Sequence, residues 1–221
     1  MKISDAHRMV FVHVPKCGGS TIDDLFVTHV PDHRKVRTPD RRHATFRQIV
    51  DVDPKVADYW SFGFVRNPWA RMVSWWSMGN DVHQRAREGR PHAVRNVTKR
   101  PYVWDAFRPY LGDFRKFVLE GTVENARFGQ PQMAWLTKPD GRMLDFVGRV
   151  EQYDDDVNVV RERLGLDPLP VQPRKNPSSH GHYSDYYDDE TRARVAEVFA
   201  PDIEAFGYTF EVPAPASSSA G

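Results

Sequence analysis

The stretch that decides the fold of this chain is RMVFVHVPKCGGST, residues 8–21. Residues 8–14 form a nearly continuous apolar run, which is typical of a parallel strand covered on both faces. Two glycines follow, and the two hydroxyl residues after them favour the start of a helix. Ser20 and Asp23 together are similar to a capping box. We therefore predict a strand, a tight turn and a helix in direct succession.

The turn over residues 15–21 has the composition of an anion site. Paired glycines let the backbone approach a ligand closely with its N–H groups turned inward. The positive end of the following helix points into the same space, and the lysine and the two hydroxyls add donors. The alternative is a tight connection in which the glycines satisfy backbone geometry alone. The predicted anion ligands are Lys16, Gly18, Gly19, Ser20 and Thr21.

A second turn of this kind follows a predicted strand at residues 61–65. Arg66 stands at the end of that strand, Asn67 and Pro68 favour a helix start, and Ser74 lies two turns into the helix. An arginine fork with a nearby hydroxyl is a good phosphate clamp. The alternative for Arg66 is a salt bridge at a strand end.

Further along the chain, strands and helices continue to alternate. We predict a third strand over residues 143–150 and helices around residues 54–60, 103–120, 153–165 and 189–206. This order indicates an α/β fold with a parallel sheet flanked by helices, whose ligands bind beyond the carboxyl ends of the strands. We expect residues 1–212 to form a single domain and residues 213–221, PAPASSSAG, to be disordered.

Composition narrows the function classes. The formal net charge is +1, which argues against a nucleic-acid binder, although basic residues crowd segments 34–47 and 85–100. The chain has one cysteine, Cys17, so it has no internal disulfide and fits a reducing compartment. No apolar run has the length of a signal or membrane segment, so we predict a cytoplasmic protein with no membrane span.

Two other kinds of site, an ATP-binding loop and a metal site, lack their motifs here. An ATP-binding loop needs Gly-x-x-x-x-Gly-Lys-Ser/Thr, and no lysine of this chain follows a glycine. His180 and His182 are two apart but have no third ligand at a recognisable spacing, so we predict no metal site. A P-loop-like small-molecule kinase and a non-catalytic binder of polyanions or nucleic acid stay as alternatives.

Together, these motifs resemble the sulfotransferase superfamily that uses 3′-phosphoadenosine-5′-phosphosulfate (PAPS). The resemblance is closest to its carbohydrate-type branch (heparan sulfate 2-O-sulfotransferase-like) and its bacterial relatives. It rests on FVHVPKCGGST (11–21), FVRNPWARMVS (64–74), DFVGRVE (145–151), KNPS (175–178) and FGYTF (206–210). One departure is Cys17, where many relatives have Thr.

The resemblance implies a P-loop-like three-layer α/β core, PAPS as donor, 3′,5′-ADP as product and no metal. It implies that Lys16 and residues 18–21 hold the 5′-phosphosulfate, and that Arg66 and Ser74 hold the 3′-phosphate. Lys175 or Ser178 would complete the donor pocket. The reaction would be an in-line transfer of a sulfuryl group to an acceptor hydroxyl of a carbohydrate, a glycolipid or a small metabolite.

The base is an expectation of the same resemblance. His43 precedes a probable short helix, as the base of the relatives does, and His13 is its rival. Residues 80–100 are rich in Arg and His with weak periodicity, so we expect a mobile loop over the acceptor side, with a merely solvated insertion as the alternative. An anionic glycan or glycolipid is among the expected acceptors. Trp75, off the apolar face of its helix, is a candidate acceptor contact.

Overall fold

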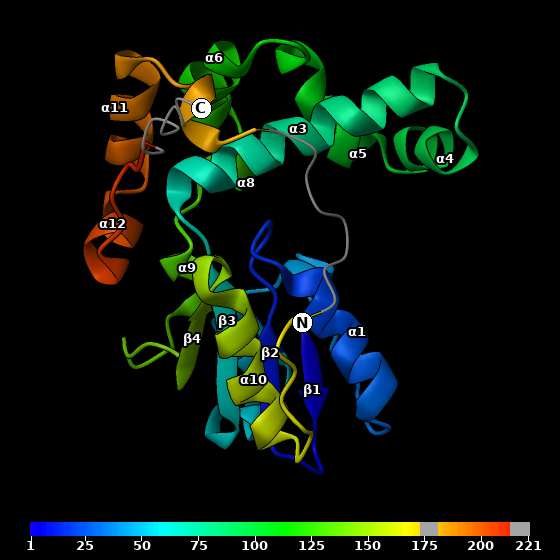
Figure 1. The fold of residues 1–221 in the computed structure, drawn as a ribbon. Coiled ribbons are helices and arrows are strands. Elements are labelled where there is room, and N and C mark those ends of the chain that lie inside the picture. Colours follow the sequence, from blue (N-terminus) through cyan, green and yellow to red (C-terminus); the bar gives the residue numbers. More distant parts are fainter. Residues whose placement is uncertain (173–180, 213–221) are drawn as a thin grey trace, which may run out of the picture. The chain divides into compact units, whose positions relative to one another are not determined.

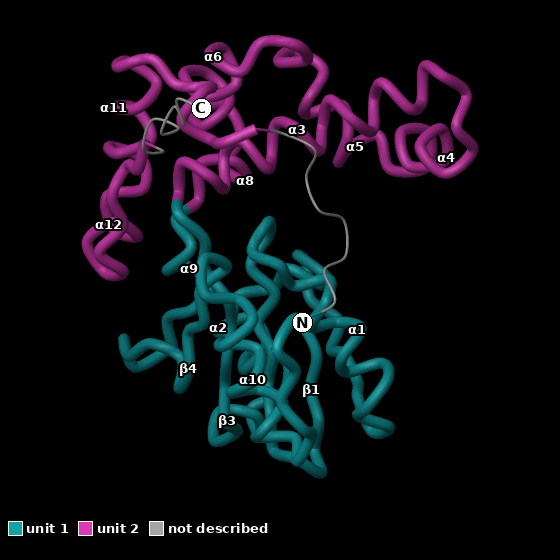
Figure 2. The backbone as a smooth tube through the Cα atoms, viewed as in Figure 1, with its two compact units in different colours: residues 1–67, 131–177 teal, residues 68–130, 178–221 magenta. Residues whose placement is uncertain are grey.

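In the computed structural model, residues 1–172 and 181–212 are described. The backbone divides into two compact units (Figure 2). The first unit comprises Met1–Asn67 and Pro131–Pro177, and the second comprises Pro68–Gln130 and Ser178–Gly221. The predicted tail at 213–221 lies outside the described residues, as do Lys175, Ser178 and His180.

A four-stranded sheet forms the centre of the first unit, in the order β1-β2-β3-β4 (Figure 1). Its strands are β1 Lys2–Ser4, β2 Met9–Val12, β3 Trp60–Val65 and β4 Phe146–Arg149. β2 pairs with β3 in parallel, with Phe11 opposite Phe62, and β3 pairs with β4 in parallel. β1 is antiparallel to β2. The predicted α/β fold with a parallel sheet flanked by helices is therefore confirmed, with one antiparallel strand added at its edge.

The helical elements of the first unit are α1 Gly19–His29, η1 Arg41–His43, α2 Phe46–Val52, η2 Pro54–Asp58, α9 Met133–Leu136, η5 Val150–Gln152 and α10 Tyr153–Arg163. The start of α2 is set by a capping box, in which the Thr45 side chain accepts from the Gln48 N–H and the Gln48 side chain accepts from the Thr45 N–H. Such a cap satisfies two backbone donors that the helix itself cannot. This capping box therefore fixes the backbone conformation two residues after His43.

The second unit is mainly helical among its described residues. Its elements are α3 Pro68–Arg87, α4 Pro91–Lys99, α5 Pro101–Trp104, η3 Asp105–Tyr110, α6 Phe114–Lys116, the π-turn η4 Phe117–Gly121, α7 Thr122–Glu124, α8 Ala126–Gly129, η6 Tyr183–Tyr186, α11 Asp189–Val198 and α12 Ala200–Phe206. Within the described residues, five helical elements begin with Pro at the first or second position: η2, α3, α4, α5 and α12. Proline is tolerated there because its missing N–H would have no partner in a helix.

Each unit has an aromatic core of its own. In the first, Phe62 lies on Phe11 and Phe26, with ring centroids 5.2 and 6.2 Å apart, and all three rings are buried. In the second, Trp75 lies against Phe128 at 5.6 Å and is 1% exposed. Burial of such large rings contributes strongly to stability in each unit.

Several predicted elements need correction. Residues 80–100 are not a loop, because α3 continues to Arg87 and α4 follows after three residues. The helix expected over 103–120 is a series of short turns, interrupted where Pro109 stands inside η3. The helix at 189–206 divides at Phe199, and residues 54–58 form a 3₁₀ turn. The edge strand β1 was not predicted.

Among the residues that the structure describes, no helix has both the length and the apolar character needed to cross a membrane.

Candidate active site

The turn between β2 and α1 has the backbone of an anion-binding loop. Lys16 and Gly18 both have left-handed conformations, with φ of 69° and 71°. Gly18 is the N-cap of α1 and brings no side-chain acceptor to the first turn of the helix. The N–H groups of a first helical turn have no intrahelical acceptors, so this end of an 11-residue helix is suited to an external anion. The helix begins at Gly19, one residue earlier than predicted, and the expected capping box of Ser20 and Asp23 is wrong.

The two glycines of this loop are required by neighbouring side chains of the protein. A Cβ atom on Gly19 would lie 2.4 Å from the imidazole of His13, and one on Gly18 would lie 2.6 Å from the ring of Tyr153. The Tyr153 hydroxyl also donates to the Gly18 carbonyl at 2.7 Å. The glycines therefore let the loop pack against a histidine on one side and a tyrosine on the other. Packing alone accounts for these glycines, whether or not the loop also binds an anion.

A buried glutamine joins the two turns that the sequence singled out. Oε1 of Gln132 accepts from the Cys17 thiol at 3.0 Å and from the backbone N–H of Arg66 at 2.9 Å. Its Nε2 donates to the carbonyl of Arg66 at 2.9 Å, and the side chain has no exposure to solvent. The end of β3 is thus held beside the anion loop, because the backbone N–H of Arg66 and the thiol of Cys17 donate to the same oxygen.

The acidic residue of the Gly-Arg-x-Glu segment supports the same edge of the sheet. Oε1 of Glu151 accepts from the backbone N–H of Asn67 at 2.7 Å, directly after Arg66. The side chain of Arg66 is half-buried. The carboxyl ends of β2, β3 and β4 therefore supply Lys16, Arg66 and Glu151 to one end of the first unit, where ligands of parallel sheets bind.

His43 is fixed next to the anion loop by its own ring and backbone. Its Nδ1 lies 2.9 Å from the carbonyl oxygen of His13, so the N–H of this tautomer is on Nδ1. The Nε2 atom is then the acceptor, and it accepts from Nε of Arg42 at 3.1 Å. The rings of His13 and His43 meet edge to face, 4.7 Å apart. The indole N–H of Trp135 donates to the backbone carbonyl of His43 at 2.7 Å.

The environment of His43 keeps its imidazole neutral. Burial, followed by the nearby His13 and Arg42, holds the pKa of His43 well below its usual value of 6.5. Burial also lowers the pKa of His13 to about 4, although Asp23, whose Oδ2 lies 3.3 Å from Nδ1 of His13, opposes this effect. A neutral imidazole that donates through Nδ1 can accept a proton at Nε2, which is the requirement for a general base.

Comparison with known proteins decides the family. The sequence profile described as "Sulfotransferase family" matches residues 1–209. The chain belongs to this family. It is 24% identical over 243 residues to carbohydrate sulfotransferase 10 of Xenopus laevis and 24% identical over 242 residues to that of Homo sapiens. Each match covers 93% of this chain and 66% of the relative, so the chain spans about two thirds of the length of these relatives.

Family membership confirms the resemblance that the sequence motifs predicted. Most of the predicted site residues belong to the first unit: Lys16, Gly18, Gly19, Ser20, Thr21, His43 and Arg66. Ser74 belongs to the second unit, on α3, and is buried, so its pairing with Arg66 on one phosphate stays a prediction. Lys175 and Ser178 lie outside the described residues, so their predicted part in the donor pocket is untested.

Three residues that support this candidate site were not predicted from sequence. Gln132 and Tyr153 hold the anion loop through hydrogen bonds, and Trp135 holds the backbone of His43. Glutamine and aromatic residues occur widely in cores, and these three lie far in sequence from the groups that they contact. Only the contacts themselves distinguish them.

One further expectation, about the Trp75 side chain, needs correction. Trp75 is not an acceptor contact, because it is buried against Phe107 and Phe128. Arg71, in the predicted 3′-phosphate segment, has no exposure, and its guanidinium donates to the carbonyl of Gln130 at 3.1 Å. Within the described part of the chain, no three His, Cys, Asp or Glu residues gather as a metal site.

Proposed function

We propose that this chain transfers a sulfuryl group from PAPS to a hydroxyl of a carbohydrate. The single observation that carries the proposal is the position of a neutral histidine beside a glycine-rich anion loop in a member of the sulfotransferase family. The names of the relatives favour a carbohydrate acceptor over a glycolipid or a small metabolite.

The donor would bind at the carboxyl ends of β2 and β3. The first-turn N–H groups of α1 and the ammonium of Lys16 suit the 5′-phosphosulfate, because both present positive charge to an anion. The half-buried guanidinium of Arg66 suits the 3′-phosphate, with Ser74 as a second donor. The glycine packing described above is compatible with this use, since it keeps the turn free of side-chain bulk at both glycines.

His43 would act as the base of the transfer. The acceptor oxygen forms a bond to sulfur while the bond from sulfur to the 5′-phosphate oxygen breaks, and the products are the sulfated acceptor and 3′,5′-ADP. The proton of the acceptor hydroxyl passes to Nε2 of His43, and Lys16 offsets the charge that develops on the leaving phosphate oxygen. Arg42 now donates to Nε2, so the acceptor hydroxyl must take its place.

The first experiment measures donor recognition by thermal shift. A ligand that binds only the native state raises the melting temperature by mass action. We expect 3′,5′-ADP to raise it far more than ATP or 5′-AMP, because only 3′,5′-ADP carries the 3′-phosphate. Arg66→Ala should lose most of this shift, whereas Arg142→Ala, in an exposed turn of the same unit where the Arg142 side chain pairs with Asp140, should keep it.

The outcome separates the proposed function from its alternatives. Equal shifts with ATP and 3′,5′-ADP would overturn the donor assignment and favour the small-molecule kinase. If no nucleotide shifts the melting temperature and heparin alone does, the chain would be a binder of polyanions. Transfer of labelled sulfate from PAPS to a glycan mixture then identifies the acceptor.

A further inference from the structure

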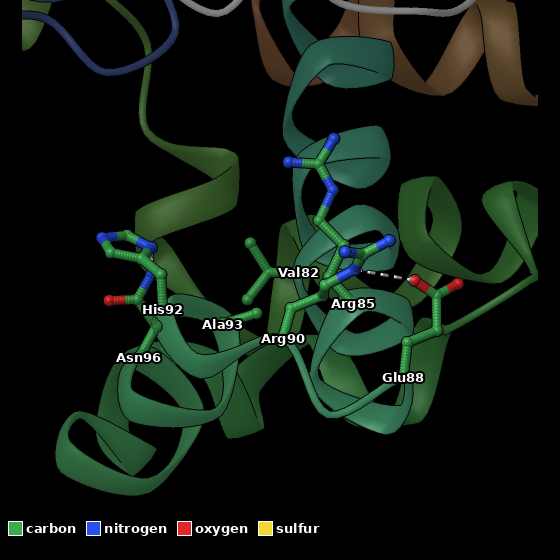
Figure 3. A pocket seen from close by; sticks show the side chains of 7 residues that line it. All are labelled: Val82, Arg85, Glu88, Arg90, His92, Ala93 and Asn96. Atoms are coloured by element: carbon green, nitrogen blue, oxygen red, sulfur yellow. Dashed lines mark hydrogen bonds and ion pairs between the residues drawn. The ribbon is translucent and has the colours of Figure 1, made fainter.

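A hollow of about 420 Å³ lies between the C-terminal part of α3 and α4, and Figure 3 shows the side chains around it, Arg85 and His92 among them. It belongs to the second unit, and its lining contains none of the predicted site residues. The polar groups that bear on the donor lie in the first unit. They meet at the buried amide of Gln132, which joins Arg66 to Cys17.

The amide of Gln132 pairs with both polar groups of one backbone residue. Its Oε1 accepts from the N–H of Arg66 and its Nε2 donates to the carbonyl of Arg66, each at 2.9 Å. This is the pattern by which two residues exchange hydrogen bonds in a sheet, and it restrains φ and ψ of the paired residue. Asn67 is held in the same way at its N–H, by Glu151 at 2.7 Å. The direction in which the Arg66 side chain leaves the backbone is therefore set by residues from later parts of the chain.

The same amide also holds the anion loop. Oε1 of Gln132 accepts from the Cys17 thiol at 3.0 Å, and Cys17 lies between the two left-handed residues of the loop, Lys16 and Gly18. Both hydrogen bonds end on one oxygen atom, so movement of Arg66 away from the loop would stretch at least one of them. Gln132 has no exposure to solvent. The geometry between the loop and Arg66 is therefore fixed from inside the protein.

The position of Gln132 is itself fixed on both sides. Pro131 precedes it, and the proline ring restricts φ at that position. Helix α9 follows directly, and its Trp135 donates to the backbone carbonyl of His43 at 2.7 Å. Gln132 is thus a rigid anchor, and a loop or strand end that it holds shares this rigidity.

We propose that Gln132 is a positioning residue that determines donor specificity. It sets the distance and the angle between the anion loop and Arg66, so that one nucleotide can engage the loop through its 5′-group and Arg66 through its 3′-phosphate. This inference rests on the proposed function, which assigns these two groups of the donor to the loop and to Arg66. Two rigidly joined anion sites favour a ligand that carries both anions, because the second contact requires little further ordering. Gln132 is fully buried, so it acts through Arg66 and Cys17.

The test measures how strongly the whole chain prefers a 3′-phosphate. This preference is the Kd of 5′-AMP divided by the Kd of 3′,5′-ADP, both from calorimetry. Gln132→Met approximately keeps the buried volume and removes the hydrogen bonds to Cys17 and Arg66. Gln132→Glu is a second variant, which keeps the shape and replaces the Nε2 donor by an oxygen. The matched control is Gln172→Met, at another buried glutamine of the first unit, whose amide bonds to Asn158 and Leu169.

We expect both Gln132 variants to lower the preference by roughly 10-fold or more, as loss of a charge-assisted contact to the 3′-phosphate implies. The Kd of 5′-AMP should change by less than about threefold, which a general loss of stability would not produce. In an Arg66→Ala background, Gln132→Met should lower the preference no further, because its effect passes through Arg66. Gln172→Met should keep the wild-type preference.

The outcomes separate this inference from the proposed function. A wild-type preference that survives in the Gln132 variants, or an equal loss of affinity for both nucleotides, would overturn the inference and leave the donor assignment intact. If Gln132→Met does not fold, Gln132→Glu decides by the same measurement. A wild-type chain that binds 3′,5′-ADP no better than 5′-AMP would instead overturn the donor assignment, and the proposed function with it.

Discussion

At the scale of single residues, His43 shows how the structure keeps an imidazole neutral with a fixed tautomer. Its Nδ1–H is held by the carbonyl of His13, so the tautomer is set by backbone. Its low pKa has burial as the first cause and neighbouring positive charge as a further one. A histidine that stays neutral at neutral pH has its lone pair ready, whereas one of ordinary pKa would be partly protonated near pH 6.5.

The first residue-scale prediction is therefore kinetic. We expect His43→Ala to leave the thermal shift with 3′,5′-ADP intact and to lower kcat by roughly 10²–10⁴-fold, as loss of a general base does. In the wild type, activity should fall only at pH values well below 6.5, since activity is lost when His43 gains a proton. Lys16→Ala should differ, because donor affinity and kcat should fall together. The measurement is the pH–rate profile at saturating PAPS.

Arg42 supplies the matched control for this profile. Its positive charge is one cause of the low pKa of His43, so Arg42→Ala should move the acid limb to higher pH. The limb should vanish in His43→Ala. An acid limb that survives in His43→Ala with near-normal turnover would show that another group takes the proton.

At the scale of elements, the connection from β2 to α1 depends on close packing. His13 occupies the space beside Gly19, and its carbonyl oxygen holds His43. A side chain at position 19 would therefore disturb both the loop and the position of His43, the proposed base. The strand, the loop and His43 are linked by these contacts, although His43 is far along the chain.

The element-scale prediction concerns Gly19→Ala. The added Cβ would lie 2.4 Å from the His13 ring, so we expect a loss of about 1–3 kcal/mol in the free energy of unfolding, as overpacking costs. Gly181→Ala, where the nearest atom would be 3.4 Å away, is the control. Adding His13→Ala should recover part of the loss in a double-mutant cycle measured by urea unfolding. Additive effects of the two substitutions would show that the clash is not the cause.

Elements bounded by strong local signals could be predicted from sequence. The apolar runs at residues 8–14 and 61–65 were recognised because β2 and β3 are buried along nearly their whole length. β1 was missed because it has three residues, and Lys2 and Ser4 are polar but buried. Residues 80–100 show weak periodicity because α3 beyond residue 79 and α4 bury few side chains. In these parts of the two helices, only Gly79, His83 and Ala93 are buried.

The site was predicted in part, for a related reason. Lys16 and Arg66 belong to short motifs that can be recognised by pattern, and His43 was predicted from its place in the family resemblance. Gln132 acts through contacts across 66 and 115 residues of sequence, with Arg66 and Cys17. No local pattern encodes such a partner, because its role comes from where the fold places it.

At the scale of the whole molecule, the chain crosses between its two compact units at residues 67/68, 130/131 and 177/178. Neither unit is therefore a continuous piece of the sequence. Residues 1–67 need residues 131–177 to complete the sheet and the hydrogen bonds that join its two turns. Both β4 and Gln132 come from the later segment. Interleaving of this kind favours one cooperative domain, as the sequence predicted for residues 1–212.

The whole-molecule prediction is a single calorimetric unfolding transition that 3′,5′-ADP moves as one. Cooperative unfolding requires that the calorimetric and van't Hoff enthalpies agree. Two transitions, of which 3′,5′-ADP moves only one, would show instead that the two units unfold as separate domains.

The buried thiol of Cys17 has a practical consequence. The chain has one cysteine, which is 1% exposed. Its thiol donates to Gln132, the residue that joins the two turns. A thiol-modifying dye reaches a buried thiol when the surrounding structure opens locally, so the labelling rate of Cys17 in native buffer measures how often the loop opens. If the donor nucleotide binds on this loop, as proposed, it should slow the labelling of Cys17. The labelling rate would then report donor occupancy without an acceptor or turnover.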